Sequence, residues 1–142
     1  SIFETSIWVW KMRPLTGFGL KSFRIKCWDV LTMIKNNIFG REANLNCATH
    51  SHNYYLEILV ETGIIGAIML ITFFIIILKN SYLYFKKYQE SKNIEAYLLF
   101  PVIVIFIIEI WPLKSSGSFF TTWNATFIWL YFSLLISFKK SA

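Results

Sequence analysis

The stretch His50–Gly66, HSHNYYLEILVETGIIG, joins a polar loop to a long apolar run. It holds both histidines of the chain, and Glu57 and Glu61 follow them. The uncharged part of the run, residues 62–78, would make about 25 Å of α-helix. Together with the preceding turn, this length crosses a bilayer core of roughly 30 Å. The stretch therefore predicts a membrane-spanning helix over residues 58–78, with two imidazoles just before its start.

Composition supports a membrane protein. Hydrophobic residues make up 56% of the 142 residues and aromatic residues 19%, which is more than a soluble domain can readily bury. The chain begins with Ser and shows no secretory leader pattern, so we expect a fragment of a longer protein. The net charge of +6 comes mainly from clusters in residues 11–41 and 79–92. In so apolar a chain, these cations favour phosphates or anionic lipid head groups as partners, and not nucleic acid.

Two further segments predict membrane spans. Residues 95–113 are strongly apolar, and residues 115–138 contain no Asp, Glu, Lys or Arg, so we place spans at 95–113 and 118–138. The basic loop 79–93 between the first two spans predicts a cytoplasmic side and places residues 1–57 on the outer side. The expected fold is an all-α, polytopic membrane helical bundle fragment. It has three transmembrane helices in residues 58–142, preceded by a periplasmic loop region, 1–57, with short helices, and both regions belong to one larger domain.

Small residues and Pro predict local features. Pro14 ends a first helix near Arg13, and the PLTGFG segment after it predicts a turn that brings backbone close to another part of the chain. Gly63 and Gly66 lie near helical spacing and would allow another helix to approach. In the second span, Glu109 is costly in lipid and is expected near the external edge, paired with Lys114.

The histidine pair has three interpretations. His50 and His52 with Cys47 could bind zinc, but the spacing is not a standard zinc pattern and no fourth ligand is evident. They could be interfacial loop residues, or one of them could act as a general base. We expect no metal. The two cysteines, Cys27 and Cys47, could pair in an oxidising compartment, but they form no framework, and free thiols are favoured.

Two motifs carry a resemblance to a known family. His52-Asn53, nine further residues and Gly63-Ile64-Ile65-Gly66 resemble the signature of the O-antigen ligase family. Upstream, RPLTGFGLKSF, with Gly17 and Gly19, resembles that family's glycine-containing segment.

The resemblance implies a multi-pass protein of the bacterial inner membrane, with its active-site loop facing the periplasm. Members of the family move a glycan from an undecaprenyl-pyrophosphate carrier to an acceptor, without a metal, nucleotide sugar or other cofactor. The acceptor is the lipid A core in ligases, another repeat unit in polymerases and a protein hydroxyl in a related branch, and we expect the lipid A core here. The expected partners are therefore this donor, the lipid A core acceptor and membrane lipids. The resemblance also implies that residues 1–142 correspond to the C-terminal part of such a protein.

Site residues follow from this chemistry. The hypothesis is that His52 takes the proton of the acceptor hydroxyl. His50 is off the motif position and either orients the reacting groups as a substrate-binding residue or only fills space, and Asn53 fixes a ring tautomer or binds a sugar hydroxyl. Cations must bind the leaving pyrophosphate, and Arg suits phosphate geometry best. The expected substrate-binding cations are Arg13, Arg24, Arg41 and Lys21, with Arg24 and Arg13 ranked first because they flank the glycine-containing turn.

Three alternatives remain open. A repeat-unit polymerase of the same family would use the same histidine motif with another acceptor. A transporter or channel fragment would place polar groups and broken helices at mid-membrane depth, whereas here the polar groups cluster at one external face. A zinc-dependent membrane hydrolase is the third alternative.

Overall fold

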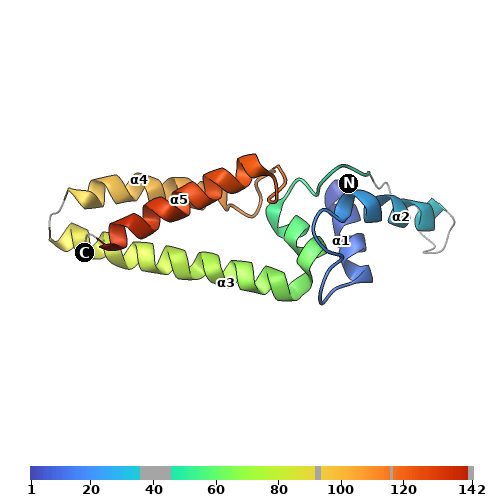
Figure 1. Ribbon diagram of the computed structural model, residues 1–142, viewed down its shortest axis with the longest axis horizontal. Coiled ribbons are helices and arrows are strands. Elements are labelled where there is room, and N and C mark those ends of the chain that lie inside the picture. The colour runs from blue at the N-terminus through green and yellow to red at the C-terminus, as the bar shows by residue number, and fades with distance from the viewer. Residues whose placement is uncertain (36–45, 92–93, 116, 141–142) are drawn as a thin grey trace. The chain divides into compact units, whose positions relative to one another are not determined.

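A computed structural model describes residues 1–35, 46–91, 94–115 and 117–140 (Figure 1). All regular secondary structure within these ranges is helical, which confirms the all-α class. The chain forms two compact units: Ser1–Met69 with Ser115–Thr121, and Leu70–Lys114 with Thr122–Ala142. The helices are α1 (Ile2–Met12), α2 (Phe23–Lys35), α3 (Tyr54–Glu90), α4 (Glu95–Glu109) and α5 (Thr122–Lys140).

In the first unit, α1 and α2 pack against each other. The Ser1 hydroxyl caps α1 by accepting the Glu4 N–H at 3.3 Å, and the helix ends before Pro14, as predicted. Apolar side chains from both helices and from the start of α3 form the core. Its fully buried members are Val9, Phe23, Cys27, Val30 and Val60.

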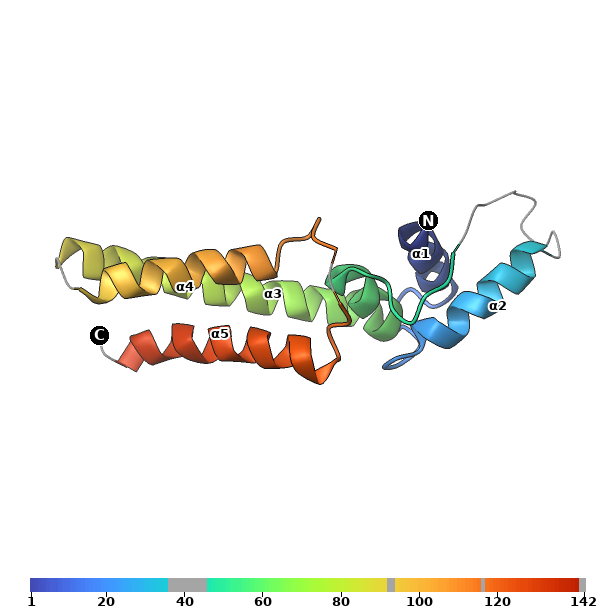
Figure 2. The same cartoon turned by 90° about the horizontal axis from the view of Figure 1, so that it is seen from above.

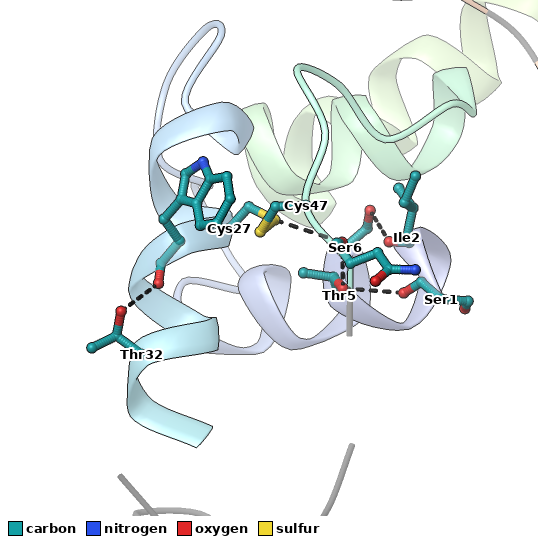
Figure 3. Close-up of a disulfide and its surroundings, with 9 residues drawn as sticks. Ser1, Ile2, Thr5, Ser6, Cys27, Thr32 and Cys47 are labelled. Atoms are coloured by element: carbon teal, nitrogen blue, oxygen red, sulfur yellow. Dashed lines mark hydrogen bonds between the residues drawn. A yellow bond between two sulfur atoms is a disulfide. The ribbon is translucent and has the colours of Figure 1, made fainter. Parts of the chain in front are cut away.

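A disulfide fastens the loop that leads into α3 (Figure 3). Cys27 on α2 is bonded to Cys47, with their Cα atoms 5.6 Å apart. The Thr5 hydroxyl of α1 donates to the carbonyl of Asn46 at 3.0 Å, so the same loop is held by both helices. The expectation of free thiols is therefore wrong. The packing of the loop on α2 brings two cysteines 20 residues apart within bonding reach, which their spacing alone does not reveal.

Helix α3 is broken at Gly63, which has φ 69° and ψ −170°. The predicted span 58–78 is thus not one continuous helix, and the apolar segment begins after the break, at Ile64. A break leaves carbonyls on one side and N–H groups on the other without helical partners. Residues 14–19 supply those partners through four backbone hydrogen bonds. These are Phe18 N–H to Val60 O (3.1 Å), Gly19 N–H to Glu61 O (2.8 Å), Ile64 N–H to Pro14 O (2.9 Å) and Ile65 N–H to Leu15 O (3.4 Å).

Two glycines allow the backbone of residues 14–19 and the backbone of α3 to approach each other closely. A Cβ added to Gly17 would lie 2.5 Å from the Glu61 carbonyl oxygen, and one added to Gly63 would lie 2.5 Å from the Thr16 nitrogen. Both positions have positive φ, which glycine adopts without strain. The PLTGFG turn therefore does bring backbone close to another segment, and that segment is α3. The neighbour at Gly63 is this turn and not a second helix as expected, whereas Gly66 faces Thr62 of its own helix.

The second unit contains the rest of α3, α4 and α5, which run alongside one another (Figures 1 and 2). Aromatic side chains connect them. The Phe73 ring lies 5.1 Å from that of Phe132, and the Phe74 ring meets Phe106 edge-on at 5.8 Å. Many other apolar side chains stay exposed, including Ile75 at 58% and Ile76 at 53%. Such a surface suits lipid better than water.

Within the described residues, α3 is the helix long and apolar enough to cross a membrane, and the apolar stretch of α4, Tyr97–Glu109, is shorter. Membrane crossing by the predicted spans 95–113 and 118–138 stays a prediction. The helix α4 ends at Glu109, before Pro112, and Glu109 pairs with Lys114 at 2.7 Å, as expected from the sequence.

Replacing Gly17 with Ala is expected to destabilise the protein more than replacing Gly19 with Ala. Both residues have positive φ, which costs an L-residue roughly 1–2 kcal/mol. A Cβ at Gly17 also collides with the Glu61 backbone, whereas one at Gly19 meets nothing within 4 Å. We expect Gly17→Ala to lose a further ~1–3 kcal/mol from overpacking. Thermal unfolding of the full-length protein in detergent measures the difference, and equal midpoints for the two variants would show that the backbones do not approach as described.

Removing the disulfide is expected to loosen the loop before α3. Cys27→Ser should lower the free energy of unfolding by about 3 kcal/mol, as loop closure over 20 residues predicts. Limited proteolysis of the full-length protein should then cut near residues 46–53 in Cys27→Ser but not in wild type. Unchanged proteolysis, or a wild-type protein that reacts with a thiol reagent before reduction, would show that the two cysteines are not bonded.

Candidate functional site

The first unit contains a polar cavity of about 190 Å³ that is partly open to the surface. Four separate segments form its walls: the start of α2, the loop before α3, the first turns of α3, and the segment 115–121. They bring two cations, two carboxyl groups, one imidazole and three hydroxyls together in one cavity. The lining residues are Lys21, Arg24, Thr49, His50, Glu57, Glu61, Ser118 and Thr121.

The histidine loop places His50, and not His52, among the residues that line the cavity. The two rings lie against each other, with centroids 4.2 Å apart, and Thr49 Oγ1 is 3.1 Å from His50 Nδ1. His52 has a φ of 55°, in the left-handed region that non-glycine residues adopt rarely. This conformation turns the chain into α3 and puts the half-buried His52 side chain beside His50.

Asn53 caps helix α3. Its Oδ1 accepts the N–H groups of Tyr55 at 3.0 Å and Leu56 at 3.2 Å. Asn is among the preferred residues at this position because its side chain satisfies N–H groups at the helix start. The Asn of the His-Asn motif thus fixes where the helix begins, and its expected role as a substrate ligand stays a prediction.

Glu57 joins two parts of the chain that lie far apart in sequence. The carboxylate is 2% exposed and accepts hydrogen bonds from the Ser118 hydroxyl and the Phe119 N–H, both at 2.5 Å. The Phe119 ring also packs edge-on against Tyr54, with centroids 5.5 Å apart. These contacts hold residues 117–121 against the first turns of α3 and form one wall of the cavity. Glu57 and its two partners lie about 60 residues apart in the chain, so nothing in the sequence indicated that they pair.

Glu61 is the second buried carboxyl group. It lies before the break at Gly63, outside the apolar segment of α3, and its side chain is also 2% exposed. Burial, and to a smaller extent the nearby charge of Glu57, raise the pKa of Glu61 to about 7. A hydrogen bond from the Lys21 backbone and the charge of Lys21 act in the opposite direction. Glu61 Oε2 has no hydrogen-bond partner in the described structure.

Of the four predicted substrate-binding cations, Lys21 and Arg24 line the cavity. Lys21 has a φ of 58°, and its backbone hydrogen bond to Glu61 holds it there. The guanidinium of Arg13 lies over the Phe18 ring, 5.8 Å from its centroid, and does not line the cavity. Arg41 lies outside the described residues. The structure therefore brings half of the predicted cations to one place.

The zinc alternative needed a thiolate from Cys47. That sulfur is bonded to Cys27, so it cannot join His50 and His52 in a metal site. The two imidazoles alone do not make the three or four ligands that zinc requires.

The described residues form a helical protein in which one helix is long and apolar enough to cross a membrane. Its polar, charged cavity precedes a long apolar helix, and two glycine-containing motifs build it. Residues 1–71 match the family model described as O-antigen ligase, and this match covers half of the 142 residues. The chain therefore belongs to the O-antigen ligase family, a family of membrane enzymes of the ligase and polymerase type. No curated protein and no solved structure matches it.

The raised pKa of Glu61 predicts that stability falls with rising pH. Folding favours the protonated form of the Glu61 carboxyl group. The contribution of this group to stability is therefore complete below the ordinary pKa of 4.5 and is lost as pH rises through about 7. Glu61→Gln keeps the shape of the side chain and cannot ionise. Between pH 5 and pH 8, the thermal midpoint of wild type should fall more than that of Glu61→Gln. Because the two proteins differ in ionisable groups only at Glu61, parallel pH profiles would contradict the burial of Glu61.

Proposed function

We propose that the protein is a metal-independent membrane glycosyltransferase. It transfers a glycan from undecaprenyl pyrophosphate to a hydroxyl of the lipid A core, with His52 as general base. The observation that carries this proposal is the cavity before the apolar part of α3. Two cations, two buried carboxyl groups and the His50 imidazole line it, and the His52 ring lies 4.2 Å from that of His50. Family membership supports the reaction class.

The pyrophosphate leaving group needs positively charged side chains beside it. The acceptor oxygen attacks the anomeric carbon, the bond from that carbon to the pyrophosphate oxygen breaks, and undecaprenyl pyrophosphate departs with the bonding electrons. Lys21 and Arg24 are the cations at the cavity and would stabilise the charge that develops on the pyrophosphate. We keep Arg13 and Arg41 as further contributors to pyrophosphate binding.

The acceptor needs a base, because a sugar hydroxyl is a weak nucleophile near neutral pH. His52 would take the hydroxyl proton onto its imidazole as the oxygen attacks. Contact with His50 restricts the orientation of the His52 ring, and the cap formed by Asn53 fixes the backbone after it. In this scheme His50 and Asn53 position the base and help to bind the sugars.

The proposed location is the bacterial inner membrane, with several spans and the cavity facing the periplasm. Two features support it. The Cys27–Cys47 disulfide is typical of an oxidising compartment, and the basic segment 79–93 favours the cytoplasmic side for the far end of α3. The broken helix would also suit a transporter, but residues 14–19 occupy the backbone groups at the break that would otherwise coordinate an ion.

Replacing His52 with Ala in the full-length protein is expected to abolish glycan transfer. Loss of a general base typically costs about 10²–10⁴-fold in rate. We would express the variant in cells that lack the native enzyme and examine their lipopolysaccharide on a gel. Wild type should restore the ladder of glycan attached to lipid A core, and His52→Ala should not, at equal protein levels.

His50→Ala is the matched control, because the two rings are in contact. It should weaken the ladder less than His52→Ala does, because it removes a positioning residue and not the base. If His50→Ala loses the ladder and His52→Ala keeps it, His50 is the base and the assignment is wrong. If wild type lengthens an existing glycan without attaching it to lipid A core, the protein is a repeat-unit polymerase.

A further inference from the structure

The cavity presents a hydrogen-bond acceptor that the proposed reaction has not yet used. Glu61 Oε2 is buried and has no partner in the described structure, although the residue is only 2% exposed. Buried polar atoms are almost always hydrogen-bonded, and an exception at the wall of a cavity points to a missing ligand. The other buried carboxylate is different, because both oxygens of Glu57 accept hydrogen bonds from the segment 115–121.

The residues around Glu61 limit the chemical class of ligand that could bind there. Lys21 and Arg24 offer donors suited to phosphate, and Thr49 and Thr121 offer hydroxyls. A phosphate alone would be repelled by two carboxyl groups at the same wall. A sugar bonded to phosphate satisfies both kinds of group, since its hydroxyls donate to a carboxylate while its phosphate oxygens accept from the cations. The volume of about 190 Å³ is below the roughly 300–1,000 Å³ of drug-sized sites, and it suits one sugar ring.

We propose that Glu61 binds a ring hydroxyl of the sugar that is bonded to the pyrophosphate, while Lys21 and Arg24 hold the phosphate beside it. This deepens the proposed function and rests on it for the identity of the donor. The break at Gly63 aids the arrangement, because the Glu61 carbonyl accepts a hydrogen bond at 2.8 Å from the N–H of Gly19, two residues before Lys21. The hydrogen bond from the Lys21 backbone to Glu61 then sets the carboxyl group beside the cations.

The test compares two probes that differ only in the sugar. Full-length protein in lipid nanodiscs is titrated at pH 8 with geranyl pyrophosphate, and with geranyl pyrophosphate carrying glucose, galactose or N-acetylglucosamine. Wild type should bind at least one sugar-bearing probe about tenfold or more tightly than geranyl pyrophosphate, as a hydrogen bond to a charged group predicts. Glu61→Gln should lose most of that preference and keep its affinity for geranyl pyrophosphate. Arg24→Ala should weaken both kinds of probe by a similar factor.

A preference that persists in Glu61→Gln would overturn the proposal, and so would a wild type without preference for any of the three sugars. A variant that merely unfolds would weaken both kinds of probe together, and the affinity for geranyl pyrophosphate reveals this. Binding is measured without turnover. The preference can therefore hold even if the lipopolysaccharide assay shows no transfer to lipid A core, so the two proposals fail separately.

Discussion

The exchange of backbone hydrogen bonds at Gly63 is the constraint on which the first unit depends. A helix that ends in the middle of a packed structure leaves polar backbone groups that must be satisfied. Residues 14–19 satisfy groups on both sides of the break, and glycines at positions 17 and 63 allow the two backbones to meet. The two family motifs are therefore the two halves of one contact, which explains physically why both require glycine.

This backbone contact also determines where the charged side chains lie. It fixes the first turns of α3, with Glu57 and Glu61, against the segment that runs on to Lys21 and α2. The disulfide and the Thr5 hydroxyl hold the loop that carries His50 on the same side. Acidic, basic and imidazole groups thus meet just before the chain becomes apolar. The cost of burying the carboxyl groups is visible in the raised pKa of Glu61.

Sequence alone predicted much of this arrangement. Pro14 correctly marked the end of α1, the apolar runs predicted helices, and the spacing of His52, Gly63 and Gly66 indicated the family. The break in α3 was missed, because Gly-x-x-Gly is equally typical of a helix that packs on another helix. The disulfide was missed because two cysteines in 142 residues do not reveal whether they lie close together. The placement of His50 at the cavity, with the His52 ring against it, depends on a single backbone conformation at His52, which residue order does not encode.

The residues 115–121 belong to the first unit although the chain on either side of them belongs to the second. The N-terminal unit is thus a discontinuous domain, completed by a short segment that arrives late in the chain. The family match ends at residue 71, and a fragment ending there would contain both motifs but not Ser118 or Phe119. Glu57 would keep its place on the helix and lose both hydrogen-bond donors. Since a ribosome makes residues 115–121 about 50 residues after that point, the cavity can close only once most of the second unit has been synthesised.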